Sequence, residues 1–119
     1  MQGSLHVQVW HLVDGELAFR IAPSKTFAVD FEWDEEKNRE NLRKHGLDFN
    51  DAWEVFAGRP LSPELDLRRN YGEDRWTVIG LLGNRLVVVT FTLGSNEVIR
   101  IISLRKALRH ERQRFEEEI

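Results

Sequence analysis

Several side chains in this 119-residue sequence are of types that transfer protons or stabilise phosphate charge. The imidazole of His45 could act as a general acid or base, because imidazole titrates near neutrality. Glu111 could orient an arginine or act as a base. The cations that could stabilise a phosphate are Lys44, which precedes His45, and the arginines Arg75, Arg100 and Arg105.

Cleavage of RNA by its own 2′-oxygen needs side chains of these types. An enzyme must help to remove the 2′-hydroxyl proton, neutralise the charge that develops at phosphorus, and protonate the leaving 5′-oxygen. The sequence shows no motif for a nucleotide or metal site, since it has no glycine-rich phosphate loop, no His pair at helical metal spacing and no Cys. We therefore expect no metal and no cofactor. The plainer interpretation of His45 is a favourable partner for a helix dipole.

Charge is unevenly distributed along the chain, although the net charge is only −3. Residues 1–67 carry 7 basic and 13 acidic side chains, whereas residues 68–114 carry 10 basic and 4 acidic ones. All but one of these ten basic residues are arginines, which grip phosphate through a planar fork, and this favours a polyanionic partner. An equally good interpretation is that the basic side chains of residues 68–114 form ion pairs with the acidic side chains of residues 1–67. The candidate RNA contacts are Arg68, Arg69, Arg100 and Arg109.

A helix over residues 34–45 is predicted to carry Lys44 and His45. A short strand at 31–33 precedes it, Asp34 is a good N-cap, and Gly46 can adopt the left-handed conformation that ends helices. This helix could form the wall of a polar site or lie loosely on the surface, because its expected inward face is largely polar. That face comprises Asn38, Asn41, Leu42 and His45.

The following elements predict an α+β domain. A second helix begins at the cap Asp48 and ends at Gly58, and an edge strand is expected at 61–63. The run 87–89 is apolar on both faces, which is typical of the most buried strand. Short gaps separate three strands, which should form an antiparallel meander before a C-terminal helix. These strands are expected at 75–82, 85–93 and 97–103.

The junction between the last strand and the last helix is predicted to place Arg105 and Glu111. Ser103 stands where a helix N-cap is wanted, after a β-branched run. Helical spacing then predicts an apolar stripe that Glu111 interrupts, the other members being Leu104, Ala107, Leu108 and Phe115. The arginines on the flank of this stripe are Arg105, Arg109 and Arg112.

The first 30 residues are predicted to form an extension to a domain that spans 31–119. Two alternating runs, 5–13 and 16–21, flank the pair Asp14-Gly15, which favours a two-residue β-hairpin turn. No apolar run approaches the length of a membrane span, and no secretory signal is readable. Cytoplasmic location without membrane contact is the expectation.

Two blocks of residues form a specific pattern in this order. The first reads Phe-Glu-Trp-Asp-Glu-Glu-Lys-Asn at 31–38 and Asn-Leu-Arg-Lys-His-Gly-Leu-Asp-Phe at 41–49. The second reads Arg-Trp-Thr-Val-Ile-Gly at 75–80, Leu-Val-Val-Val-Thr-Phe-Thr at 86–92 and Ile-Arg-Ile-Ile-Ser-Leu-Arg-Lys-Ala at 99–107. Over about residues 31–116 the chain resembles the BrnT family of toxins.

The resemblance implies a RelE-like fold and a metal-independent endoribonuclease, the toxin of a type II toxin–antitoxin pair, which inhibits translation by cleaving RNA. It implies a BrnA-like antitoxin with a ribbon-helix-helix portion, and operator DNA bound only through that antitoxin. The positions that match the family's motifs are Lys44, His45, Arg75, Ser103 and Arg105, and with Glu111 they are the expected catalytic residues.

Two departures from the family pattern bear on this expectation. Phe115 stands where many relatives have Tyr, so a hydroxyl role is absent there, and the Thr92-Leu93-Gly94 turn lacks the charges often found after the middle strand. The alternative function is a catalytically weak binding module that tethers a DNA-binding antitoxin. Direct binding of duplex DNA by the last helix is a third hypothesis, disfavoured because the apolar stripe commits that helix to the core.

Overall fold

The computed structural model describes residues 2–7, 9–13, 16–20, 27–58, 60–68, 72–93 and 98–118. The strands are β1 (Gln2–Val7), β2 (Val9–Val13), β3 (Glu16–Arg20), β4 (Phe27–Glu32), β5 (Glu64–Leu65), β6 (Trp76–Leu82), β7 (Arg85–Leu93) and β8 (Ile99–Lys106). The helical elements are α1 (Glu35–His45), the 3₁₀ turn η1 (Phe49–Asp51), α2 (Trp53–Ala57) and α3 (Arg109–Glu118).

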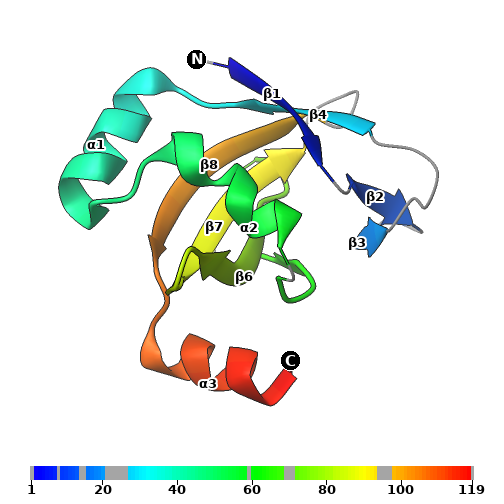
Figure 1. Ribbon diagram of the computed structural model, residues 1–119, viewed down its shortest axis with the longest axis vertical. Coiled ribbons are helices and arrows are strands. Elements are labelled where there is room, and N and C mark those ends of the chain that lie inside the picture. The colour runs from blue at the N-terminus through cyan, green and yellow to red at the C-terminus, as the bar shows by residue number, and fades with distance from the viewer. Residues whose placement is uncertain are drawn as a thin grey trace.

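Six of the described strands form one sheet in the order β1-β4-β8-β7-β6-β5 (Figure 1). Neighbouring strands are antiparallel except for β4 and β8, which are parallel. The predicted α+β class and the meander of β6, β7 and β8 are therefore confirmed, although the connection at 94–97 lies outside the described residues.

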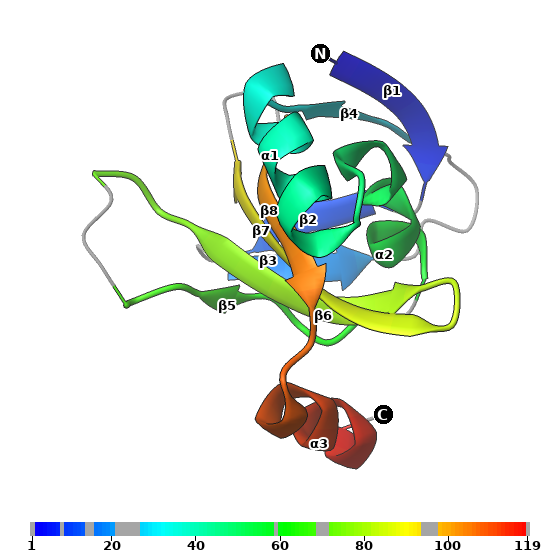
Figure 2. The same ribbon diagram turned by 90° about the vertical axis from the view of Figure 1, so that its left-hand side faces the viewer.

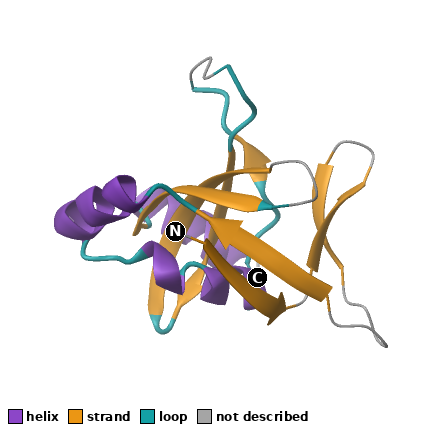
Figure 3. Ribbon diagram, turned by 90° about the horizontal axis from the view of Figure 1, so that it is seen from above, coloured by secondary structure: helices purple, strands orange, loops and turns teal. Residues whose placement is uncertain are grey.

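The N-terminal strands add a ladder of their own. β2 and β3 pair antiparallel, with Val13 opposite Glu16, which is the register that a two-residue connection requires. The predicted Asp14-Gly15 turn itself lies outside the described residues. Viewed from above, α1 lies at one end of the molecule and the β2–β3 pair at the other (Figure 3).

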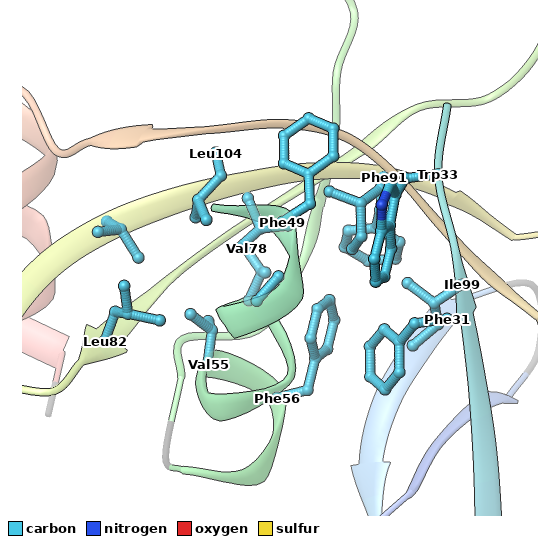
Figure 4. Close-up of a cluster of buried hydrophobic side chains, with 14 of the residues drawn as sticks. Phe31, Trp33, Phe49, Val55, Phe56, Val78, Leu82, Phe91, Ile99 and Leu104 are labelled. Carbon is cyan, nitrogen blue, oxygen red and sulfur yellow. The ribbon is translucent and has the colours of Figure 1, made fainter. Parts of the chain in front are cut away.

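The main hydrophobic core lies between one face of the sheet and the η1–α2 segment. The ring of Phe56 on α2 packs against Phe31 and Phe91, with ring centroids 5.6 and 5.2 Å apart (Figure 4). Val87 and Val89 of β7 face this core, while Val88 faces a smaller cluster on the opposite side. The middle strand is thus buried on both faces, as its sequence predicts.

The smaller cluster attaches α3 to the opposite face of the sheet. Phe115 is the buried residue of α3, and it packs with side chains from the meander and the segment before β5. The other members of this cluster are Leu61, Ile79, Leu86 and Val88. Because one buried side chain anchors the helix, polar contacts have a large share in fixing its position.

The ends of α1 confirm the sequence prediction. Asp34 Oδ1 accepts from the backbone N–H groups of Glu36 and Lys37 at 2.9 and 3.3 Å, and these bonds hold the pKa of its carboxyl below the usual value. Gly46 ends the helix with φ of 68°. The prediction that four residues of α1 face inward is confirmed for Asn38 and Asn41, which are buried. It is wrong for Leu42 and His45, which are exposed.

Asn41 completes the outer edge of β8 beyond the point where β4 stops pairing with it. Its Nδ2 donates to Leu104 O at 2.8 Å and to Leu47 O at 3.0 Å, and its Oδ1 accepts from Leu104 N at 3.2 Å. The amide therefore pairs with both backbone groups of Leu104, as a neighbouring strand would. The polar face of α1 supports the fold in this way.

The second helix is divided where the sequence predicts one continuous element. Asp48 caps η1 through a 2.9 Å hydrogen bond from Asn50 N, and α2 follows after Ala52 and ends at Gly58. The edge strand predicted at 61–63 was misplaced, because β5 forms at Glu64–Leu65, where it pairs with Thr77 and Trp76.

The boundary between the last strand and the last helix was wrong in the sequence prediction. Ser103 is not an N-cap but an interior residue of β8, paired with Thr90, and the strand continues to Lys106 because β7 offers partners as far as Val87. Leu104 belongs to the main core, and Leu108 is 54% exposed. The predicted stripe on the last helix therefore reduces to Phe115, which weakens the objection to direct DNA binding.

Candidate functional site

A cleft of about 500 Å³ lies on the face of the sheet that carries α3. Its floor is formed by Thr77 and Ile79 of β6 and Val88 of β7. One wall is β5 with the segment that follows it, and the other is the end of β8 with the first turns of α3, which lies beyond the end of β8 in Figure 2. The remaining lining residues are Glu64, Leu65, Asp66, Leu67, Arg68, Arg105, Leu108, His110, Glu111 and Arg114.

Arg105 is held in one orientation by Glu111. Its Nη1 and Nη2 donate to Glu111 Oε1 and Oε2 at 2.7 and 2.9 Å, a bidentate pair in which the side chains are 26% and 14% exposed. Nη1 also donates to Lys106 O at 3.2 Å. Two elements meet in this pair, since Arg105 comes from β8 and Glu111 from α3.

The arrangement leaves one edge of the Arg105 guanidinium available. Glu111 accepts one N–H from each of the two terminal nitrogens, Nη1 and Nη2. The Nε–H and the other N–H of Nη2, which point to the same side of the guanidinium, have no hydrogen-bond partner within the described chain. Two parallel N–H groups of this kind match two oxygens of a phosphate. Arg105 can therefore bind an anion bidentately without releasing Glu111.

Glu111 also fixes the start of α3. Its Oε1 accepts from Leu108 N at 2.7 Å, so the carboxylate occupies the third helical position and reaches back to the residue before the helix, as in a capping box. The bonds from Arg105 and then from Leu108 N–H lower the pKa of Glu111, against an opposing effect of burial. The carboxylate is thus suited to orienting Arg105 and is a poor proton acceptor.

Two further arginines line the cleft, each paired with a carboxylate. Arg68 binds the buried Asp66 through Nε at 2.9 Å and Nη2 at 2.8 Å. Arg114 bridges from α3 to β5 through a 2.8 Å ion pair with Glu64. The cleft therefore presents three oriented guanidiniums at a site that is nearly neutral overall.

The structure brings together three of the residues that the sequence singled out. Arg105, Glu111 and Arg68 all line the cleft. Lys44 and His45 do not, because they end α1, whose buried residues contact the edge of β8 and η1. Lys44 is exposed and lies 3.7 Å from Glu40.

Four other predicted residues lie outside the cleft. Arg75 precedes β6 and lies 3.6 Å from Glu73 through its Nε. Ser103 is inside β8, and Arg100, near the start of that strand, is 3.7 Å from Glu32, roughly 16 Å along the strand from Arg105 at about 3.3 Å per residue. Arg109 is exposed on α3 and does not line the cleft, and Arg69 lies outside the described residues. Of the cations that the sequence suggested for stabilising a phosphate, Arg105 lines this cleft, whereas Lys44, Arg75 and Arg100 do not.

Sequence reasoning missed four charged or titratable cleft residues, which are Glu64 and Asp66 on the β5 side and His110 and Arg114 on α3. On α3, His110 directly precedes Glu111, which the sequence did single out, and Arg114 lies about one turn beyond Glu111. The two residues on α3 were hidden because the position of α3 against the sheet depends on where β8 ends, and the sequence prediction ended that strand at Ser103 instead of Lys106. The sequence carries no standard signal for them, because Leu108 at the N-cap position of α3 lacks the side-chain oxygen that marks a helix start.

The part of the chain that the structure describes contains no group of three or more His, Cys, Asp or Glu side chains able to hold a metal ion. In the same residues, no helix is long and apolar enough to cross a membrane.

The described chain is a small α+β domain with a cleft that is lined by three arginines. A family model described as "Ribonuclease toxin, BrnT, of type II toxin-antitoxin system" matches residues 33–111. The chain therefore belongs to the BrnT family of ribonuclease toxins. A similar solved structure is the 1.1 Å crystal structure of the Brucella abortus ribonuclease toxin BrnT, with 33% sequence identity and a TM-score of 0.51. The match covers 66% of this chain and 96% of that chain. A comparison with curated proteins found no match.

Proposed function

We propose that this protein is a metal-independent endoribonuclease that cleaves RNA in the cleft around Arg105 and thereby inhibits translation. Membership of a ribonuclease toxin family supports the activity. The observation that carries the site is the Arg105–Glu111 pair, with bonds of 2.7 and 2.9 Å that leave a bidentate donor edge available.

In this proposal the three guanidiniums have different roles. Arg105 binds two non-bridging oxygens of the scissile phosphate and neutralises the charge that develops as the 2′-oxygen attacks phosphorus. Glu111 is a positioning residue, because it touches Arg105 and not the phosphate. Arg68 follows β5 and Arg114 belongs to α3, and both line the cleft, so they can contact the flanking phosphates of a single strand.

The family also guides proposals about partners and organisation. We infer that a BrnA-like ribbon-helix-helix antitoxin neutralises the toxin, and that operator DNA is bound through this antitoxin. We further propose that the fold is RelE-like and that residues 31–119 form the toxin domain, with 1–30 as an extension, since the family match starts at residue 33. The roles of Lys44, His45, Arg75 and Ser103 that the resemblance implies would require contacts outside this cleft.

A second candidate function is a catalytically weak module that binds the antitoxin. The observation that favours it is that Arg68, Arg105 and Arg114 are each already paired with a carboxylate. Such a cleft could be closed to RNA if those pairs were stable in the presence of substrate. The two candidates differ in whether the purified chain cleaves RNA.

Substitution of Arg105 tests the proposed site. We expect Arg105→Ala to cleave RNA at least about 100-fold more slowly than the unsubstituted protein, because a preorganised charge-stabilising group is lost. Arg105→Lys should recover part of the rate, since lysine keeps the charge but not the planar fork. Arg39→Ala is the matched control, because Arg39 is exposed on α1 and lies away from the cleft. Equal rates for Arg105→Ala and Arg39→Ala would refute the site.

A further inference from the structure

Cleavage in this cleft needs a group that moves a proton, and the guanidiniums cannot supply it. Arginine does not release its proton in proteins, so Arg68, Arg105 and Arg114 can stabilise charge but cannot act as acid or base. This inference therefore rests on the proposed function and concerns which side chain completes it.

The carboxylates of the cleft are already committed to arginines. Glu111 is bonded to Arg105 and Leu108 N–H, Asp66 is bonded twice to Arg68, and Glu64 is paired with Arg114. A proton taken up by any of these carboxylates would weaken the ion pair that it makes. Their contacts suit them to holding arginines in place.

His110 is the remaining proton-transferring side chain on the described lining of the cleft. It is exposed, it belongs to the first turn of α3, and it directly precedes Glu111 in the sequence. Imidazole accepts and releases protons near neutral pH. The charged groups that face the same cleft are Arg105 from β8, Glu111 and Arg114 from α3, and Glu64, Asp66 and Arg68 from β5 and the segment after it.

We propose that His110 is the general base that takes the proton from the ribose 2′-hydroxyl. The O2′–H bond breaks as the proton passes to the imidazole, and the O2′–P bond forms while the P–O5′ bond breaks. The electron pair of the broken bond stays on the 5′-oxygen, which takes a proton from water. The products are a 2′,3′-cyclic phosphate and a 5′-hydroxyl, and the imidazolium returns its proton to solvent. This role replaces the one that the sequence suggested for His45.

The test compares His110→Ala and His110→Gln with Gln113→Ala, a substitution at an exposed residue of the same helix outside the cleft. We expect both His110 variants to lose about 100- to 10,000-fold in kcat, with a small change in KM, and Gln113→Ala to retain activity. Because His110 is exposed, all three should fold, which circular dichroism can check. Added imidazole should restore part of the kcat of His110→Ala, and a purely structural role would not give this rescue.

A substrate with sulfur in place of the 5′-oxygen separates base from acid, because a sulfur leaving group needs no proton. If His110 is the base, His110→Ala stays slow on this substrate. Full recovery there, absence of imidazole rescue, or loss of kcat in His45→Ala with none in His110→Ala would each overturn the proposal. Absence of cleavage by the unsubstituted protein would instead contradict the proposed function, so the two failures are distinguishable.

Discussion

Glu111 joins three parts of the cleft through a single carboxylate. It orients Arg105 of β8, caps the start of α3 through Leu108 N–H, and adjoins His110. A carboxylate that accepts three hydrogen bonds and is mostly shielded from water resists protonation, which agrees with its lowered pKa. The same residue therefore contributes to stability and to the geometry of the proposed site.

Glu111→Gln should lower the free energy of unfolding by about 1–2 kcal/mol at neutral pH, because a charge-assisted bidentate pair becomes a weaker one. The folded-state pKa of Glu111 lies below its ordinary value of 4.5, so its contribution is complete above that pH and is lost as the pH falls through the folded value. Urea unfolding at neutral pH and at a series of lower pH values should therefore show a difference between the two proteins that narrows as the pH falls. A difference that stays constant or widens in acid would contradict this role.

At the residue scale, the sequence predicted the cleft residues that matched a family motif or stood out by type. Arg105 and Glu111 were found in this way, although their pairing was not. His110 and Arg114 were missed because their side chains meet the cleft through the position of α3, which depends on where β8 ends. The arginines Arg75 and Arg100 were indistinguishable from Arg105 by type, and only their places in the fold, before β6 and near the start of β8, separate them from it.

At the element scale, the length of β8 decides the shape of the site. Pairing with β7 carries the strand past Ser103 to Lys106 and overrides the capping preference of serine. This extension places Arg105 at the end of the sheet, opposite Val88, and delays α3 until Arg109. Capping signals alone predicted α1 correctly, because its ends at Asp34 and Gly46 are local, whereas the end of β8 depends on a partner strand.

Asn41→Ala tests the edge of β8 on which this geometry depends. The substitution leaves the N–H and C=O of Leu104 and the C=O of Leu47 without their buried amide partner, so we expect a loss of about 2–4 kcal/mol in the free energy of unfolding. Asn50→Ala, which removes an exposed side-chain bond to Asp48, should cost less than about 1 kcal/mol. Urea unfolding of both variants provides the measurement, and equal losses would show that the Asn41 amide does not support the strand.

At the scale of the whole molecule, the uneven charge distribution left two interpretations open, a polyanionic partner or internal ion pairs between the two halves of the chain. Arginines of the basic half pair with carboxylates of the acidic half at Arg68–Asp66, Arg114–Glu64 and Arg100–Glu32. The first two pairs line the cleft, so internal pairing occurs at the same place as the proposed phosphate site. Composition could not predict these pairs, because Arg68–Asp66 forms within one segment, Arg100–Glu32 forms where β4 pairs with β8, and Arg114–Glu64 forms where α3 reaches β5.

The most direct test of the account is incubation of the purified full-length protein with single-stranded RNA in the presence of a chelator, followed by analysis of the cleaved ends. We predict cleavage that yields 2′,3′-cyclic phosphate or 3′-phosphate ends together with 5′-hydroxyl ends, because in the proposed mechanism the 2′-oxygen attacks phosphorus without a metal ion. RNA that stays intact in chelator but is cleaved when a divalent metal is restored, or 5′-phosphate ends, would contradict the account.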